Sequence, residues 1–348
     1  MNLLAFITHL IFALLLASMS GFITWWMLKR VKIMDVPNER SSHERPTPSG
    51  GGMAIVITFM VGVIAIFVFA DAHIDRRFFW GFLVSTLAIA TISYYDDIKN
   101  YSAKIKLVTH FFAVLLVLAA GNVLDELALP VFDSVELGWA GYLLTFFWLL
   151  GLSNAYNFMD GIDGMAASMA VITCAFFGWI TFHQGSHVIY IVCYSILAGA
   201  AGFLFWNRPP ARIFMGDIGS AFLGFTLACM AIIADRYDMS HTSFLVVPLL
   251  LFHFIFDTSF TMCRRALHGE NITQAHRTHL YQLLVRMGMS HASVTGSYCL
   301  LGIIQGFAAI SMMELADEQK LWMFLPFLLL YSLLAREIIS RAKRLAII

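Results

Sequence analysis

The sequence alternates between long apolar runs and short polar segments. Eleven runs approach the ~20 residues that a helix needs to cross a bilayer: near 3–28, 50–70, 78–94, 107–124, 138–152, 165–182, 188–206, 219–235, 243–262, 294–313 and 321–338. The fifth is short, and without it the count is ten. Because backbone groups in hydrocarbon must hydrogen-bond within their own segment, these runs predict α-helices. No internal repeat is visible, so the pattern predicts one all-α, polytopic membrane domain over residues 1–348.

Composition supports a membrane setting. The chain is 59% hydrophobic and 13% charged, with a mean hydropathy of +0.77, whereas soluble proteins carry about 25% charged residues. The formal net charge of +0 gives no reason to expect a nucleic-acid partner. The first apolar run is too long for a cleaved signal and leads into basic residues, so we expect it to be retained as a span.

Lysine and arginine are distributed unevenly over the predicted loops. With eleven spans, one side holds 18 of the 22 basic residues: Lys29, Arg30, Lys32, Arg40, Arg45, Lys99, Lys104, Lys106, Arg208, Arg212, Arg264, Arg265, Arg277, Arg286, Arg336, Arg341, Lys343 and Arg344. The other side holds Arg76, Arg77, Arg236 and Lys320. The positive-inside rule therefore predicts that the N-terminus is outside and the C-terminus is in the cytosol.

The polar segments with motif-like character all fall on the predicted cytosolic side. They read DVPNERSSHERPTPSGGG, YYDDIKNYSAKIK, SNAYNFMDGIDG, NRPPARIFMGDIGS and CRRALHGENITQAHRTHLYQLLVRMG. The loops on the opposite side are short or lack such motifs. This agreement between charge and motif placement favours an active site on one face of the bilayer.

Five aspartates on this face suggest a metal. Asp96 and Asp97 are adjacent, Asp160 and Asp163 share a face if the sixth run already begins as a helix there, and Asp217 opens the eighth run. Neighbouring carboxylates repel one another unless a cation lies between them. Mg²⁺ takes carboxylate oxygens and is completed by water and substrate phosphates. Charge that merely ends helices is the simpler alternative for any one acid, but five together favour the metal.

Two glycine-rich stretches suit phosphate binding. PSGGG (48–52) and GDIGS (216–220) both open apolar runs, where free helix N-terminal N–H groups can bind an anion. Glycine also packs membrane helices closely, which is the competing explanation. The basic residues that can neutralise phosphates are Arg45, Lys99, Lys104, Lys106, Arg208, Arg212, Arg264 and Arg265. The positive-inside rule explains most of them equally well.

Three further polar features leave their roles open. Asp257 lies in the otherwise apolar LFHFIFDTSF, and an ionisable residue within a span is a functional candidate. An ion pair with Arg264, two helical turns later, is the alternative. His276 and His279, with Arg277 between them, can form a metal site, donate to phosphate or form a solvated turn.

The ordered motifs PNERSSH…PTPSGGG, DD, NFMDGIDG, N(x)9D ending in FMGD, and HRTH resemble the polyprenyl-phosphate N-acetylhexosamine-1-phosphate transferases. The resemblance runs from Asp35 to about Leu284, and NFMDGIDG and FMGD are its specific segments. It implies Mg²⁺-dependent transfer, with Mn²⁺ as a substitute, of a sugar 1-phosphate from a UDP-linked N-acetylated amino sugar to undecaprenyl phosphate. UMP is released, and the product starts a lipid-linked glycan such as O-antigen at the bacterial inner membrane. A second copy of the chain, as a homodimer, is a further candidate partner.

The resemblance also implies roles for matched residues. Asp217 and Asp97 would hold the metal, Asp96 completes the acidic pair, and Lys106 and His279 belong to the catalytic set. The substrate-binding candidates are Asn157, Asp160, Asp163, Asn207, Phe214 (matching an aromatic that stacks on uracil), His276, Arg277 and Arg45. In one departure, Tyr281 and Gln282 stand where many members have two further histidines. The HRTHLYQ form resembles the subgroup that uses 6-deoxy amino sugars.

Two other classes stay open on the sequence. A membrane prenyltransferase also uses cytosolic aspartates and Mg²⁺, but it would show two DxxxD-like motifs, and the paired forms here are DD and DGID. A secondary transporter would place polar residues near the bilayer midplane, often in repeated halves. His110, His253 and Asp257 approach that pattern, but no repeat is visible. Release of UMP distinguishes the transferase from both.

Overall fold

The computed structural model describes residues 3–31, 33–37, 45–69, 76–99, 103–129, 132–186, 188–271, 274 and 276–348. Lys32, Arg40 and most of the PNERSSH motif (residues 38–43) lie outside the described residues. What the sequence predicts for them is left as a prediction.

The described chain is mainly helical. Its helices are α1 (Leu3–Arg30), α2 (Gly52–Phe69), α3 (Arg76–Lys99), α4 (Ala103–Ala119), α5 (Trp139–Phe158), α6 (Met165–His183), α7 (Ile189–Asn207), α8 (Asp217–Arg236), α9 (Val246–Leu250), α10 (Phe252–Leu267), α11 (Leu280–Arg286), α12 (His291–Met312) and α13 (Phe324–Arg344), with a 3-10 turn η1 (Asp317–Met323). Two short antiparallel sheets join β1 (Met34–Asp35) to β2 (Thr47–Pro48) and β3 (Glu126–Leu129) to β4 (Phe132–Glu136).

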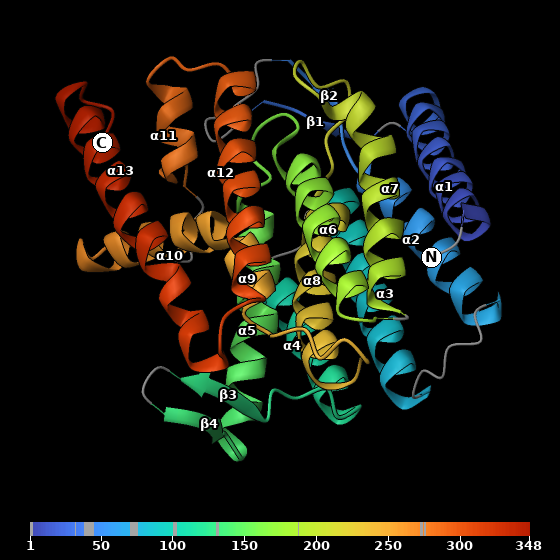
Figure 1. Cartoon of the computed structure of the whole chain (residues 1–348). Helices are drawn as coiled ribbons and strands as arrows, with labels where there is room; N and C mark the ends of the chain where they lie inside the picture. Colours follow the sequence, from blue (N-terminus) through green and yellow to red (C-terminus); the bar gives the residue numbers. More distant parts are fainter. Residues whose placement is uncertain are drawn as a thin grey trace.

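Helix α8 forms the centre of the bundle, and nearly all of its residues are buried. It packs against α2, α3 and α5. Side-chain hydrogen bonds add to the α5–α8 packing, because Ser153 Oγ donates to the carbonyl of Ala221 at 3.1 Å and Trp148 Nε1 donates to that of Ala228 at 3.0 Å. Figure 1 shows β1–β2 and α11 at one end of the bundle and the β3–β4 hairpin at the other.

Within the described residues, six helices are long and apolar enough to cross a bilayer: Ile7–Arg30, Met165–His183, Ile189–Asn207, Asp217–Arg236, His291–Met312 and Asp317–Arg344. Gly52–Ala65 and Ile105–Ala119 are shorter apolar helices. The prediction of an all-α membrane protein is therefore confirmed. The count of eleven spans and the orientation of the termini stay predictions.

The ninth apolar run is not one straight helix. It divides at Leu251 into α9 and α10, and α10 runs across the direction of its neighbours (Figure 1). The side chains of His253, Asp257, Thr261 and Arg265 recur at helical spacing and are buried on one face of α10. A polar stripe of this kind needs hydrogen-bond partners inside the protein rather than lipid. Asp257 shows this, since its partners lie on α11 and α12.

Candidate active site

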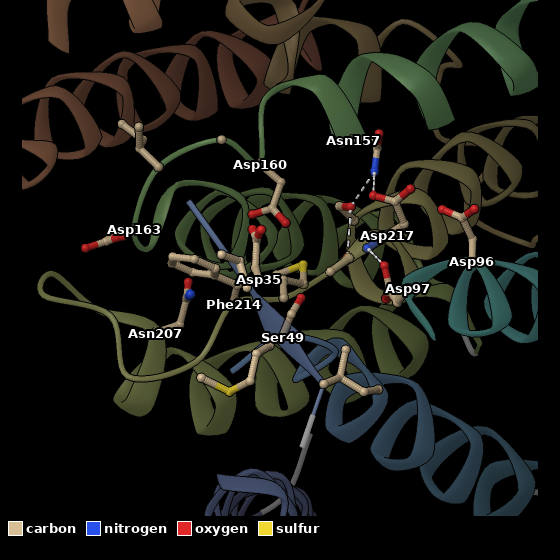
Figure 2. A pocket seen from close by; sticks show the side chains of 18 of the residues that line it. Asp35, Ser49, Asp96, Asp97, Asn157, Asp160, Asp163, Asn207, Phe214 and Asp217 are labelled. Carbon is tan, nitrogen blue, oxygen red and sulfur yellow. Dashed lines mark hydrogen bonds between the residues drawn. The ribbon is translucent and has the colours of Figure 1, made fainter. Parts of the chain in front are cut away.

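A cavity of about 640 Å³ opens where several helix ends meet. Helices α3, α5 and α7 end there, and α4, α6 and α8 begin there. Nine of the sequence-predicted residues line it: Asp96, Asp97, Lys106, Asn157, Asp160, Asp163, Asn207, Phe214 and Asp217. The cavity is elongated. Figure 2 shows Asp96, Asp97 and Asp217 at one end, Asp163, Asn207 and Phe214 at the other, and Asp160 between them.

The three aspartates at the first end form a compact acidic group. One carboxylate oxygen of each of Asp96, Asp97 and Asp217 lies within 4.8 Å of the others. The ammonium group of Lys106 bridges Asp96 and Asp217. Asn157 Nδ2 donates to Asp217 Oδ1 at 2.9 Å and to Ser220 Oγ at 2.8 Å. The end of α5 therefore holds the Asp217 carboxylate toward the cavity.

Asp97 also joins α3 to the start of α8. Its Oδ1 accepts the N–H of Asp217 at 2.9 Å and its Oδ2 accepts that of Ile218 at 3.2 Å. These are two of the donors that a helix N-terminus leaves without an intrahelical partner. Burial, followed by the nearby charge of Asp217, raises the pKa of Asp97 to about 7. Burial also raises the pKa of Asp160, in the loop before α6, above its usual range. Two carboxyl groups of the cavity therefore hold a proton more readily than an exposed aspartate does.

The residues at this end fit a hard divalent cation. Carboxylate oxygens are the ligands that Mg²⁺ prefers, and Lys106 already places one cationic group between two of the three acids. Asp96 Oδ1 is buried and accepts no hydrogen bond from the described residues. Asp96, Asp97 and Asp217 would hold the ion. Asp96 thereby joins Asp217 and Asp97, the two metal ligands that the resemblance implied.

The two glycine-rich stretches pack against each other instead of offering free N–H groups. The N–H of Gly51 donates to the carbonyl of Phe214 at 2.9 Å, and that of Gly52 donates to Met215 at 2.8 Å. A Cβ on Gly52 would lie 2.3 Å from the Cα of Gly219. The N–H groups of Gly51 and Gly52 are therefore not available for phosphate. The N–H groups of Asp217 and Ile218 are not available either, because they donate to Asp97. The expectation that these four N–H groups bind phosphate is wrong. Close helix packing was the correct explanation.

At the other end, the cavity is built from two loops. Asp160 and Asp163 lie before α6 begins at Met165, so the expectation that a helix aligns them is wrong. Asn207 donates to the carbonyl of Ile213 at 2.8 Å and accepts the N–H of Gly164 at 3.0 Å. Its amide therefore ties the loop before α6 to the loop after α7. Asn207 positions both loops and also lines the cavity, so the substrate contact expected of it stays a prediction.

Asp257 connects α10 to the start of α11. It accepts the N–H of Leu280 at 2.8 Å and the hydroxyl of Tyr298 at 2.8 Å, and His279 Nδ1 lies 3.3 Å away. The alternative of an ion pair with Arg264 is wrong, because that guanidinium donates to the carbonyl of Thr278. Asp257 positions the HRTH segment.

Tyr281 occupies one of the positions where many family members have a histidine. Its hydroxyl donates to the carbonyl of Phe158 at 2.9 Å, and it lies so close to Gly161 that a Cβ there would be 1.9 Å away. The side chain thus supports the loop that carries Asp160 and Asp163. His279 is buried and stacks on Phe158, so it lies behind this loop and outside the cavity lining.

The remaining predicted residues also lie outside the cavity lining. Burial and the neighbouring His279 lower the pKa of His276 to about 4, so His276 is neutral near pH 7. Arg45 is exposed, just before β2, and the carbonyl of Arg277 accepts a hydrogen bond from Arg286. Their substrate contacts stay predictions.

Sequence reasoning missed five cavity-lining polar residues: Asp35, Ser49, Ser220, Gln282 and His291. Asp35 begins the DVPN segment, Ser49 and Ser220 lie in the two glycine-rich stretches, and Gln282 lies in HRTHLYQ. Those four were therefore within motifs already recognised. His291 lies in no motif, and nothing in the sequence indicated its place in the cavity.

Comparisons with known proteins indicate the family. The glycosyl transferase family 4 model matches residues 79–235. A probable undecaprenyl-phosphate N-acetylglucosaminyl 1-phosphate transferase of Bacillus subtilis is 30% identical over 307 residues, covering 87% of this chain and 84% of the relative. A phospho-N-acetylmuramoyl-pentapeptide-transferase of Listeria innocua is 32% identical over 208 residues, covering 56% of this chain and 64% of the relative. The chain belongs to the polyprenyl-phosphate N-acetylhexosamine-1-phosphate transferases of glycosyl transferase family 4.

Proposed function

We propose that this transferase moves an N-acetylated amino-sugar 1-phosphate from a UDP-sugar to undecaprenyl phosphate and releases UMP. The observation that carries the proposal is the division of the cavity into two ends. Three aspartates and Lys106 form one end, and Phe214 with Asp163 forms the other (Figure 2). One end suits phosphates with a divalent cation, and the other suits a nucleoside that stacks on an aromatic ring.

The chemistry needs alignment more than a strong base. A phosphate monoester has a second pKa of about 6, so the acceptor is largely a dianion at neutral pH. An oxygen of the lipid phosphate attacks the β-phosphorus of the UDP-sugar. The bond from that phosphorus to the oxygen bridging to the α-phosphorus breaks, and UMP leaves with that oxygen.

The protein's own groups bring the reactants together. Lys106 presents an ammonium group toward the phosphates, and Asn157 fixes the carboxylate of Asp217. A bound Mg²⁺ would supply charge neutralisation for phosphoryl oxygens held among the aspartates.

The lipid reaches the site along the apolar side of α4. Leu107, Val108 and Phe112 are exposed on this helix, immediately after Lys106. An isoprenoid chain can lie against such a surface while its phosphate meets Lys106 and the aspartates. The nucleotide-sugar enters from the cytosol in the proposed orientation, which the uneven distribution of basic residues supports.

The donor and pathway form the finer part of the proposal. Tyr281 and Gln282 follow His279 as in the subgroup that uses 6-deoxy amino sugars, such as N-acetyl-fucosamine or N-acetyl-quinovosamine. We propose such a donor and the start of an O-antigen as the pathway. A donor panel that includes UDP-N-acetylglucosamine tests this directly.

The purified chain in nanodiscs, with undecaprenyl phosphate, Mg²⁺ and a panel of UDP-amino sugars, should release UMP with at least one donor. Omitting the lipid, or adding EDTA, should stop release. A membrane prenyltransferase or a transporter would release no UMP under any of these conditions. UMP release that continues without lipid would contradict the proposed acceptor.

Direct attack of the lipid phosphate on the UDP-sugar, without a covalent protein intermediate, has its own test. Incubating the protein with UDP-sugar labelled at the β-phosphorus, without lipid, should leave the protein unlabelled. A stable label on the chain that Asp97→Asn removes would indicate a covalent intermediate instead.

A further inference from the structure

His291 begins α12 at the wall of the active-site cavity. The preceding Ser290 caps the helix, with Oγ accepting the N–H of Ser293 at 3.2 Å. The imidazole Nδ1 of His291 lies 3.2 Å from Oδ1 of Asp163. Both side chains line the cavity and are partly exposed to it, at 19% for His291 and 13% for Asp163. The capped helix start therefore presents the ring to this carboxylate from a fixed position.

The position of the loop itself does not depend on this pair. Thr295, one turn further along α12, donates its hydroxyl to the backbone carbonyl of Asp163 at 2.9 Å. Tyr281 supports the same loop through Phe158 and Gly161. Backbone placement is thus provided by other residues, and the His291 contact acts on the carboxylate.

The Asp163 carboxylate is held from two sides. Its Oδ2 accepts the N–H of Ala211 at 3.0 Å, from the loop that also carries Phe214, and its Oδ1 meets His291. An ionised carboxylate offers about four acceptor sites, so contacts to the protein and to a ligand can coexist on it. The carboxylate lies at the end of the cavity with Phe214 and Asn207, opposite the three metal-ligand candidates (Figure 2).

We propose that His291 is a positioning residue for the nucleoside half of the donor. It orients the Asp163 carboxylate so that this group accepts hydrogen bonds from the nucleoside stacked on Phe214. The inference rests on the proposed function, because it takes the Phe214 end as the nucleoside end. Helix α12 thereby takes part in nucleotide binding. Loss of the His291 side chain should lower the affinity for the nucleotide and leave the phosphoryl-transfer step unchanged.

The probe is UMP, which carries the nucleoside half without the unidentified sugar. We expect His291→Ala to weaken UMP binding by about tenfold, as for loss of a hydrogen bond to a charged group. The KM for the UDP-sugar should rise by a similar factor while kcat stays within about twofold, and the KM for undecaprenyl phosphate should not change. His183→Ala, an exposed histidine bonded to its own helix, is the matched control and should bind UMP like the wild type.

Conservative variants separate positioning from simple packing. Asparagine places an amide N–H near the Nδ1 position, so His291→Asn should keep most of the affinity. Glutamine places its amide near the Nε2 position instead, so His291→Gln should lose as much UMP affinity as His291→Ala. In an Asp163→Asn background, His291→Ala should add little further loss, because the pair acts as a unit.

Several results would overturn the inference. One is a folded His291→Ala variant that binds UMP as tightly as the wild type. Another is that His291→Ala weakens UMP binding by the same factor in the wild-type protein and in the Asp163→Asn variant. If the alanine variant does not fold, equal UMP binding by the asparagine and glutamine variants overturns it. A wild-type protein that neither binds nor releases UMP would overturn the proposed function as well, whereas active wild type with an unaffected His291→Ala overturns this inference only.

Discussion

Asp97, near the end of α3, accepts the backbone N–H of Asp217 at the start of α8 at 2.9 Å. The contact joins two segments that are 120 positions apart in sequence. One metal-ligand candidate therefore fixes the backbone of another. A substitution at Asp97 can therefore change both the stability of the helix bundle and the arrangement of the acidic group. The choice of substitution must separate the effect on stability from the effect on turnover.

Asp97→Asn and Asp97→Ala should differ in stability but not in activity. Alanine removes both acceptors at the start of α8 and should cost about 1 kcal/mol, as for other lost helix caps. Asparagine keeps one acceptor oxygen and should unfold closer to the wild type. Both remove a charge from the acidic group and should reduce turnover by about 100-fold. Thermal unfolding and UMP release measure the two effects, and an asparagine variant with wild-type turnover would contradict the role of Asp97 in the site.

Lys106→Met should increase affinity for a divalent cation while lowering turnover. The ammonium group neutralises Asp96 and Asp217, so its removal leaves three close carboxylates without their cation. We expect Mn²⁺ to bind at least about tenfold more tightly, given the strength of charge interactions at these separations. Electron paramagnetic resonance titration measures this. Lys99→Met, at the end of α3, is the control and should leave Mn²⁺ affinity unchanged. Equal affinity in both variants would contradict the bridging role.

Gly161→Ala should disturb the loop that carries Asp160 and Asp163. A Cβ at this position would lie 1.9 Å from the Tyr281 hydroxyl oxygen, which is too close for any side chain. Adding Tyr281→Phe removes that oxygen, so the double variant should recover part of the lost stability and UMP release. Tyr281→Phe by itself should cost about 1 kcal/mol, for the lost bond to Phe158. If adding Tyr281→Phe lowers the stability and UMP release of Gly161→Ala further, the clash with the Tyr281 hydroxyl is not the cause of the defect.

Asp257→Asn should destabilise the protein by about 3 kcal/mol, because a buried acceptor of several hydrogen bonds loses its charge. Its carboxylate accepts the N–H groups of Leu280 and Tyr281 and the hydroxyl of Tyr298. Asp125→Asn is the matched control, since that carboxylate is half exposed and its pair with Arg236 should contribute less than about 1 kcal/mol. Chemical unfolding in detergent compares them, and equal losses would contradict the role of Asp257 as a buried anchor.

Much of the site could be predicted because family motifs mark helix ends. DD ends α3, NFMDGIDG links α5 to α6, and FMGD opens α8, so the sequence predicted that these acids meet. The uneven distribution of basic residues predicted one common face for these segments, and the acids do meet where the helix ends converge. Apolar runs predicted the helices for a similar reason, since a lipid-facing helix needs continuous apolar sequence.

The rest depended on contacts that no local pattern contains. Gly52 and Gly219 suit a phosphate site or a helix crossing equally well, and only their mutual contact shows the crossing. Asp257 has its partners on α11 and α12, which are distant in sequence, so no local pattern predicted how this buried carboxylate is satisfied. His291 lies at an ordinary capped helix start, and its place in the cavity arises from how α12 packs beside the loop before α6.

The central claim is that the sugar 1-phosphate moves to a lipid phosphate among Asp96, Asp97 and Asp217. The most direct measurement follows a UDP-amino sugar labelled at the β-phosphorus, with undecaprenyl phosphate and Mg²⁺ in nanodiscs. The account predicts that the label appears in the lipid in a one-to-one ratio with UMP, and that Asp217→Asn abolishes the transfer with every donor. Labelled lipid formed at the wild-type rate by Asp217→Asn, or UMP released without label in the lipid, would contradict it.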